Sequence, residues 1–237
     1  MEDLRGIARR RSWYHTIDLN EGLVTEGWFD LRPYVAKYGL PARLDGLRAL
    51  EVGTWDGFWA FELERRGAEV IALDLDEERA LDWPPRRRPQ EGSSEPRGTG
   101  FALAKQILGS RVERVVRSIY DASPAELGTF DLVFCGSVLI HLRDQYLALE
   151  RMAELCRGQL ILAEEYDRIA QLCPVPMSRY LADRKGATVF WLPSVRTWRR
   201  MVWSVGFERV REHTRFDMHS RDGTFSIRHV VIHADKE

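Results

Sequence analysis

The residues of this sequence that could do chemistry are a short glycine-containing segment, Glu51 to Gly57, and a later carboxylate, Asp74. Gly53 and Gly57 can turn the backbone sharply and bring it close to a ligand, where a Cβ atom would obstruct the approach. Asp74 ends the next apolar run, and a carboxylate at such a strand end can accept hydrogen bonds from both hydroxyls of a ribose. The pattern therefore predicts a cofactor that contains adenosine.

The residue between the two glycines distinguishes among such cofactors. Dinucleotide enzymes place a third glycine there to admit a pyrophosphate, whereas this sequence has Trp55, which is too bulky. Glu51, two positions before Gly53, can instead receive the ammonium group of a methionine moiety, directly or through water. This combination is typical of S-adenosylmethionine sites. An ordinary strand, turn and helix of another α/β domain and a nicotinamide oxidoreductase are the alternatives.

Further candidates follow from the rule that open α/β sheets bind ligands beyond the carboxyl ends of their strands. The cofactor candidates chosen in this way are Glu51, Gly53, Thr54, Trp55, Gly57, Asp74, Leu75, Ile119, Tyr120, Asp121 and Gly136. Ile119 and Tyr120 would flank the adenine. Asp121 would accept a hydrogen bond from the exocyclic amine, or serve instead as a turn or N-cap residue ahead of Ser123.

The acceptor side of the site is predicted from one histidine and several aromatic residues. His141 follows a buried strand and is the candidate catalytic residue, because a hydroxyl acceptor loses a proton as it takes a methyl group and needs a general base. A structural histidine bonded to a loop is the alternative. The remaining candidates chosen by residue type are Trp13, Tyr14, His15 and Trp191. Such rings can wall a pocket, or fill the core between an N-terminal cap and the sheet.

Composition argues against several other classes of protein. The net charge of -1 gives no overall bias toward nucleic acid or membrane, and the three cysteines without C-x-x-C spacing suggest neither disulfides nor a zinc knuckle. His229 and His233 share a strand face but lie about 13 Å apart at strand rise, so we predict no metal site. The charged N-terminus and the lack of a long apolar run predict a cytoplasmic protein without a membrane segment.

Alternating apolar strands and amphipathic helices position these residues, as in repeated βαβ units. The predicted strands span residues 48–52, 69–75, 112–117, 130–135, 159–164, 207–216 and 226–233, and the predicted helices span 58–66, 101–108, 147–156 and 195–205. The last two strands flank Arg221-Asp222-Gly223 and form a hairpin at the sheet edge. The fold class is therefore α/β and Rossmann-like, with a mostly parallel seven-stranded sheet and an antiparallel last strand.

The chain divides into two parts. Residues 1–44 are predicted to form an N-terminal helical cap or lid, and residues 45–237 the catalytic domain. Within that domain, residues 81–100 are rich in proline, glycine and serine, so we expect a mobile loop without a regular element. Residues 166–195 interrupt the alternation, and we expect this insert to cover the acceptor pocket.

The assembled segments resemble class I methyltransferases over residues 45 to 235. The segments F-D-L-V-F-C-G-S-V-L-I-H at 130–141, Arg179-Tyr180, V-F-W-L-P-S at 189–194 and the strand at 228–232 are similar, in order, to the bacterial tRNA wobble-uridine carboxymethyltransferase family. Trp13 to Asp18 is similar to the segment before that family's domain. The resemblance implies S-adenosylmethionine as cofactor and S-adenosylhomocysteine as product.

The same resemblance bears on the cofactor and the acceptor, and it adds Arg179, Tyr180 and Arg228 to the acceptor-side candidates. In that family a lysine, a tyrosine and an arginine hold the extra carboxylate of carboxy-S-adenosylmethionine, and they correspond here to Arg11, Ile140 and Arg228. Ile140 cannot donate a hydrogen bond, which favours the plain cofactor over the carboxylated one. We expect methyl transfer to oxygen or nitrogen of a small molecule. The alternatives are tRNA modification, with Arg9 to Arg11 and Arg86 to Arg88 on phosphates, and a non-catalytic binding module.

Overall fold

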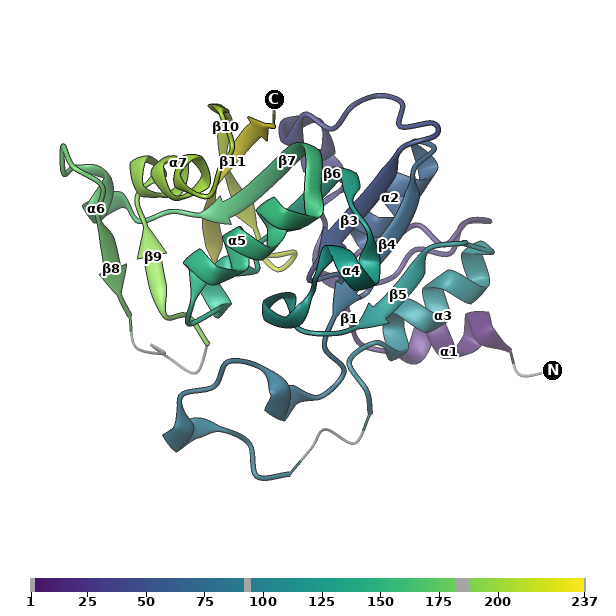
Figure 1. The fold of residues 1–237 in the computed structure, drawn as a ribbon. Coiled ribbons are helices and arrows are strands. Elements are labelled where there is room, and N and C mark those ends of the chain that lie inside the picture. Colours follow the sequence, from purple (N-terminus) through teal and green to yellow (C-terminus); the bar gives the residue numbers. More distant parts are fainter. Residues whose placement is uncertain (1–2, 92–94, 182–187, 237) are drawn as a thin grey trace.

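The computed structural model describes residues 3–91, 95–181 and 188–236. Seven strands form one sheet in the order β10-β11-β7-β6-β3-β4-β5 (Figure 1). These strands are β3 (Arg48–Val52), β4 (Glu69–Asp74), β5 (Glu113–Val116), β6 (Phe130–Gly136), β7 (Cys156–Glu165), β10 (Arg209–His219) and β11 (Ser226–Asp235). Only β11 runs against the others, because its pairings with β7 and with β10 are both antiparallel. The predicted sheet and its antiparallel last strand are confirmed.

Helices cover both faces of this sheet. The α-helices are α1 (Leu4–Arg10), α2 (Phe58–Arg65), α3 (Thr99–Leu108), α4 (Pro124–Leu127), α5 (Gln145–Leu155), α6 (Arg168–Gln171) and α7 (Val195–Ser204). The 3-10 helices are η1 (Arg32–Tyr38), η2 (Glu78–Ala80), η3 (Pro85–Arg87), η4 (Ile119–Asp121) and η5 (Leu139–His141). Asp144 and Ser194 begin α5 and α7, because each side chain accepts a hydrogen bond from a backbone N–H of the first turn.

Each face of the sheet buries its own hydrophobic core. On one face α2, α3 and the N-terminal cap pack around Phe61 and Phe101, and on the other α5 and α7 pack around Leu149 and Trp198 (Figure 1). Residues 160–163 of β7 are fully buried and alternate between the two cores. Burial on both faces explains why the central strands read as continuous apolar runs.

The N-terminal cap contains strands as well as helices. Between α1 and η1 lie two short parallel strands, β1 (Trp13–His15) and β2 (Gly27–Phe29). Their aromatic residues favour extended structure, and Pro33 at the start of η1 suits the first turn of a short helix. The predicted helical cap is therefore of mixed structure, with its two short strands between the helices.

The expectation that residues 81–100 lack a regular element is wrong at two places. Residues 85–87 form η3, and residues 99–100 begin α3. Gly100 lies in the first turn of this helix. It is buried there, and a Cβ atom at this position would collide with the carboxylate of Asp56, so the close contact requires glycine. The connection between β4 and α3 extends outward beyond the end of β4 (Figure 1). Residues 92–94 of this segment lie outside the described residues.

The insert at residues 166–195 contains α6 and a small antiparallel pair, β8 (Ser178–Tyr180) and β9 (Trp191–Pro193). Residues 182–187, between these two strands, lie outside the described residues. Within the part of the chain that the structure describes, no helix combines the length and the apolar character needed to cross a bilayer.

Candidate functional site

The glycine segment between β3 and α2 turns sharply at the carboxyl edge of the sheet. Its backbone is left-handed at Gly53 (φ 80°), Trp55 (φ 47°) and Gly57 (φ 93°). A Cβ atom on Gly53 would collide with Val138, and one on Gly57 with the ring of Phe61, so both positions need glycine. Trp55 differs, because a residue with a side chain rarely adopts a positive φ. Contacts of its ring must offset that strain.

Two neighbours from distant parts of the chain hold the Trp55 ring. The Tyr14 ring stacks on it with centroids 4.5 Å apart, and the Arg97 guanidinium lies 3.8 Å from the indole centroid. Arg97 also forms an ion pair with Glu78 at 2.8 Å. A cation over an indole face is attracted by the ring quadrupole, so these contacts stabilise the conformation that Trp55 adopts.

Asp74 is the last residue of β4, and its side chain reaches the glycine segment. Its Oδ2 accepts a hydrogen bond from the backbone N–H of Trp55 at 2.7 Å, and its Oδ1 accepts one from the N–H of Leu75 at 2.7 Å. A carboxylate offers about four lone pairs, so each oxygen retains acceptor capacity. The two bonds fix the orientation of the group, and the remaining capacity suits a pair of vicinal hydroxyls.

Glu51 and Thr54 supply buried polar atoms beside the same turn. Oε2 of Glu51 and Oγ1 of Thr54 have no hydrogen-bond partner among the described residues, although both side chains are buried. Burial raises the pKa of Glu51 to about 8. The nearby Thr54 hydroxyl opposes this rise, and the charge of Asp74 adds to it. A buried carboxylate with an unpaired oxygen is costly to ionise unless a cation neutralises it. The position therefore fits an ammonium group.

Asp56 joins the cap to the glycine segment. Its Oδ2 accepts hydrogen bonds from the backbone N–H groups of Tyr14 at 2.7 Å and His15 at 3.2 Å. Burial raises the pKa of Tyr14 to about 12 and lowers the pKa of His15 to about 3. Both side chains are therefore neutral near pH 7, and the wall that the cap places on the site carries no charge from them.

The turn after β6 is held by buried groups from the neighbouring strands. Oε1 of Glu164 accepts hydrogen bonds from the N–H groups of Val138 and Leu139, both at 2.9 Å. Ser137 has a φ of 58°, and its hydroxyl lies 2.6 Å from Nε2 of His229 on β11. Burial raises the pKa of Glu164 to about 7. Strands β7 and β11 thus fix the backbone that leads into η5.

His141 ends this turn with a defined tautomer. Its Nδ1 lies 2.9 Å from the carbonyl oxygen of Thr188, and a carbonyl only accepts, so Nδ1 carries the proton and Nε2 the lone pair. Burial lowers the pKa of His141, and the positive charge of Arg97 contributes to the decrease. The N–H of Phe190 donates to the carbonyl of Ile140 at 3.1 Å, which packs the insert on η5. A neutral imidazole with an available lone pair is suited to accept a proton.

The expected adenine side is formed by η4 and by part of the β4–α3 connection. Ile119 is buried, and the Tyr120 hydroxyl donates to Asp82 at 2.7 Å. Asp121 is exposed at the end of η4, and the N-cap position of α4 belongs to Ser123. A turn residue is thus what the structure shows at Asp121, and its contact with an adenine amine stays a prediction.

The structure brings the predicted cofactor residues together at one edge of the sheet. They lie at the ends of β3, β4 and β6, in the turns that follow, or in η4: Glu51, Gly53, Thr54, Trp55, Gly57, Asp74, Leu75, Ile119, Tyr120, Asp121 and Gly136. Among the acceptor candidates, Tyr14 and His15 contact the glycine segment. Trp13 is buried, and its indole N–H donates to the carbonyl of Ala8 at 2.8 Å, so that its ring fills the core.

Other acceptor candidates form a separate group on the β8–β9 pair. The Tyr180 and Trp191 rings lie 4.6 Å apart, and both residues are exposed, Trp191 less than Tyr180. Arg179 donates to the buried carboxylate of Asp167 at 2.5 Å. These residues belong to the insert that packs on η5, and their contact with an acceptor stays a prediction.

Of the three positions matched to the carboxylate-binding residues of the carboxymethyltransferase family, two hold arginines with acidic neighbours and one holds no donor. Arg11 lies 2.6 Å from Glu95, and Arg228 lies 3.9 Å from Asp217. Ile140 is buried and has no donor. Among the described residues, no group of three or more histidine, cysteine, aspartate and glutamate side chains is arranged to hold a metal ion.

Sequence reasoning assigned no role to four residues that organise the site, namely Asp56, Asp82, Arg97 and Glu164. A signal existed for Glu164, because a carboxylate at the end of an apolar buried strand requires partners. Asp56 lies inside the glycine segment, yet its partners are backbone groups that no side-chain pattern reveals. Asp82 and Arg97 lie in the segment expected to be mobile, and their contacts depend on the tertiary fold.

Comparison with known proteins identifies the family to which this chain is similar. Residues 24–212 match the family whose description is "Methyltransferase domain". The tRNA U34 carboxymethyltransferase of Desulforapulum autotrophicum is 24% identical over 166 residues, which cover 69% of this chain and 45% of that protein. The chain spans less than half the length of the curated relatives that it matches.

Solved structures resemble this fold over nearly its whole length. The N-terminal domain of EvdMO1 with S-adenosylhomocysteine bound gives a TM-score of 0.70 at 16% identity, covering 100% of this chain and 98% of that one. The same domain in the presence of S-adenosylhomocysteine and D-fucose gives 0.68, with the same identity and coverage. Magnesium protoporphyrin IX methyltransferase from Synechocystis PCC 6803, with S-adenosylmethionine bound, gives 0.55 at 16% identity over 87% of this chain and 78% of that one.

Proposed function

Because this chain belongs to the methyltransferase-domain family, we propose that it moves a methyl group to an oxygen or nitrogen atom of a small-molecule acceptor. The cofactor is S-adenosylmethionine, and S-adenosylhomocysteine is the product. One observation supports the assignment of this site more strongly than any other observation does. Asp74 and the partnerless Oε2 of Glu51 present acceptor oxygens on the two sides of the turn at Gly53 to Gly57.

Residues at the ends of the strands divide the binding of the cofactor and the chemistry between them. Glu51 binds the ammonium group of the cofactor, Asp74 the ribose hydroxyls, and η4 flanks the adenine. When bound, the sulfonium supplies an electrophilic methyl group. Nε2 of His141 takes the proton that an acceptor hydroxyl or amine releases, while Nδ1 stays bonded to the carbonyl of Thr188. The insert that carries Thr188 and Phe190 limits the access of water to this side.

The Asp74→Ala variant tests the cofactor site by calorimetric titration with S-adenosylhomocysteine. Hydrogen bonds to a charged group are worth about 1.5–3 kcal/mol each, so we expect affinity to fall by about 10- to 100-fold. Asp45→Ala removes an exposed carboxylate beside Arg43 and serves as the control, with unchanged affinity. If the wild-type protein binds no S-adenosylhomocysteine, or if the Asp74 variant binds as the wild type does, the assignment of the site is wrong.

Two features of this chain favour a small acceptor over a polyanion. The net charge is -1, and the aromatic rings at the site come from the protein's own cap, which Asp56 ties to the glycine segment. The three cysteines are free, which supports a reducing cytoplasmic setting as part of the same proposal. Plain S-adenosylmethionine is retained over the carboxylated cofactor, because Ile140 offers no donor.

A second candidate is modification of a tRNA wobble uridine. The similarity of 24% to the tRNA U34 carboxymethyltransferase favours it, as do the exposed arginines at 9–10 and 86–88. Salt distinguishes the two candidates, because each phosphate contact releases counterions and RNA affinity falls steeply as salt rises. Submicromolar tRNA binding that weakens about 10³-fold between 50 and 200 mM salt would favour the RNA substrate. Absent or salt-insensitive binding favours a small molecule.

A further inference from the structure

A hollow lies at the same edge of the sheet as the cofactor residues, between the cap and the β10–β11 turn. Its volume is about 550 Å³, within the range of small-ligand sites, and its lining includes Trp28, Phe225, Arg221 and Asp222. Its position follows from the sheet register, because β11 is antiparallel to β7 and pairs His229 with Glu165. The turn that precedes β11 therefore lies beyond the carboxyl end of β7. Another hollow, of about 370 Å³, lies at the opposite edge, beside residues 157–159.

Aromatic contacts connect this hollow with the glycine segment. The Tyr14 ring, which stacks on Trp55, lies 6.4 Å from the ring of Trp28. Phe225 packs edge-on against Phe29 at 5.6 Å. Trp28 is 69% exposed and Phe225 is 46% exposed, so both present ring surface at the hollow. Exposed aromatic residues scattered singly need no explanation, whereas two at one hollow beside a cofactor site indicate a binding surface.

The polar groups of the hollow have mixed charge. Arg221 lies 3.3 Å from Glu26, and Asp222 accepts hydrogen bonds from the hydroxyls of Ser220 and Thr224 at 2.7 and 2.8 Å. The Ser220 hydroxyl and then the Thr224 groups hold the pKa of Asp222 below its usual range, so this group is charged near neutral pH. Two carboxylates and one guanidinium disfavour a phosphate-rich ligand. They suit a neutral ligand with several hydroxyls, each of which can donate to a carboxylate and accept from arginine.

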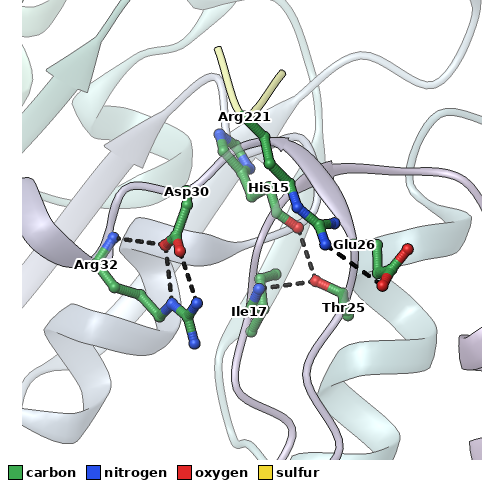
Figure 2. A network of polar contacts seen from close by, with 7 residues as sticks. All are labelled: His15, Ile17, Thr25, Glu26, Asp30, Arg32 and Arg221. Carbon is green, nitrogen blue, oxygen red and sulfur yellow. Dashed lines mark hydrogen bonds and ion pairs between the residues drawn. The ribbon is translucent and has the colours of Figure 1, made fainter. Parts of the chain in front are cut away.

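The surface is held in place by hydrogen bonds on both sides, as Figure 2 shows for the cap side. The Thr25 hydroxyl donates to the carbonyl of His15 at 2.8 Å and accepts from the N–H of Ile17 at 2.7 Å. The N–H of Arg221 donates to the carbonyl of Trp28 at 2.7 Å, which ties the turn to β2. Because these groups are ordered before a ligand arrives, binding loses less conformational entropy.

We propose that this hollow binds a neutral hydroxylated ring of the acceptor, that is, a sugar, with its C–H face on Trp28 and its hydroxyls on Asp222 and Arg221. This inference rests on the proposed function, since it names the class of the small-molecule acceptor. An indole face and a few placed polar groups are the chemistry that recognises such a ring. D-fucose, in whose presence the similar EvdMO1 domain was crystallised, provides a suitable first probe.

The test is a titration of the protein, saturated with S-adenosylhomocysteine, with D-fucose and a panel of neutral hexoses. Saturation-transfer NMR detects the binding of each sugar. We expect at least one sugar to bind at about 10 mM or tighter, and Trp28→Ala to weaken it about tenfold. Asp222→Asn should also weaken it. Trp203→Ala is the control, because Trp203 is 50% exposed on α7, where Arg200 lies over its ring. This control should bind sugar as the wild type does.

Three outcomes would overturn the inference. The protein could bind S-adenosylhomocysteine but none of the sugars, the Trp28 and Trp203 variants could bind sugar equally, or Trp28→Ala could turn a dimer into a monomer in sedimentation, which would make the hollow a protein interface. Affinity of each variant for S-adenosylhomocysteine should not change, and it reports separately on the proposed function. Loss of that affinity in the wild type would contradict the proposed function itself.

Discussion

Two buried glutamates are the residues whose ionisation matters most at this site. Glu51 lies on the sheet face covered by the cap and has a pKa of about 8, while Glu164 lies on the other face and has a pKa of about 7. Burial is the main cause in both cases. Oε1 of Glu164 accepts hydrogen bonds from two backbone N–H groups. Oε2 of each glutamate has no hydrogen-bond partner among the described residues, but no backbone N–H bond of the same geometry is found there at either oxygen of Glu51. The two carboxylates should therefore respond differently to the cofactor.

Binding of S-adenosylhomocysteine is expected to release a proton from Glu51. With a pKa of about 8 the group is mostly protonated at pH 7 in the ligand-free protein, and pairing with the ammonium requires the carboxylate. We expect about 0.9 proton to be released at pH 7, by linkage. Calorimetry in two buffers of different ionisation enthalpy measures this number. Glu51→Gln should abolish the release and weaken binding, and release that persists in this variant would contradict the role of Glu51.

The same shift determines how the stability of the ligand-free protein depends on pH. The pKa of each glutamate is raised in the folded state above its ordinary value of 4.5, so the folded protein binds more protons than the unfolded chain between the ordinary and the raised value. These groups therefore contribute most stability below pH 4.5, and that contribution is lost as the pH rises through about 7 to 8. Comparing thermal unfolding of the wild type and Glu51→Gln from pH 5 to 8 isolates the contribution of Glu51, because the glutamine at position 51 cannot ionise while Glu164 is present in both proteins.

At the scale of elements, the site depends on the close approach of the glycine segment to the turn after β6. Gly53→Ala should destabilise the fold by about 2–4 kcal/mol, because the positive φ disfavours a side chain and the new Cβ atom would collide with Val138. Gly109→Ala is a matched control. Gly109 also has a positive φ, of 62°, but open space at its Cβ position, so it should lose only the conformational part.

A double-mutant cycle separates the collision from the conformational strain. Adding Val138→Ala to Gly53→Ala should recover part of the lost stability, with a coupling energy of about 1 kcal/mol or more in urea unfolding. If the two substitutions are additive, the contact between these two elements does not determine the cost. The coupling is expected because the turn at Val138 is itself fixed by Glu164.

The elements of the central sheet could be predicted because burial on both faces makes their strands apolar throughout, as in β6 and β7. The residues just after those strands could be predicted with them, since the carboxyl edge of such a sheet binds ligands. The strands of the cap were not predicted, because three-residue segments carry no periodicity. Nor were the contacts of Asp82 with Tyr120 and Arg143, which join parts of the chain that only the tertiary fold brings together.

For the molecule as a whole, the cap and the catalytic domain share one hydrophobic core. Cap residues such as Leu19 and Tyr38 belong to the same buried cluster as Trp59 of α2 and Phe134 of β6. The Tyr38 ring lies 4.2 Å from that of Trp59. A cap that buries this much of the sheet face is not an independent lid, because its removal would expose the core. We therefore expect one cooperative unfolding transition, and the cap and the cofactor site should be lost together.

Asp56→Ala tests this coupling, because Asp56 joins the cap to the cofactor segment. The substitution leaves the buried N–H groups of Tyr14 and His15 without their acceptor, at a cost of about 1–3 kcal/mol each. We expect lower stability in urea, faster hydrogen exchange at these amides and weaker binding of S-adenosylhomocysteine. The exposed Asp45→Ala variant should stay within about 0.5 kcal/mol of the wild type. A separate early transition for the cap, with full cofactor affinity in the Asp56 variant, would show instead that the cap docks independently of the site.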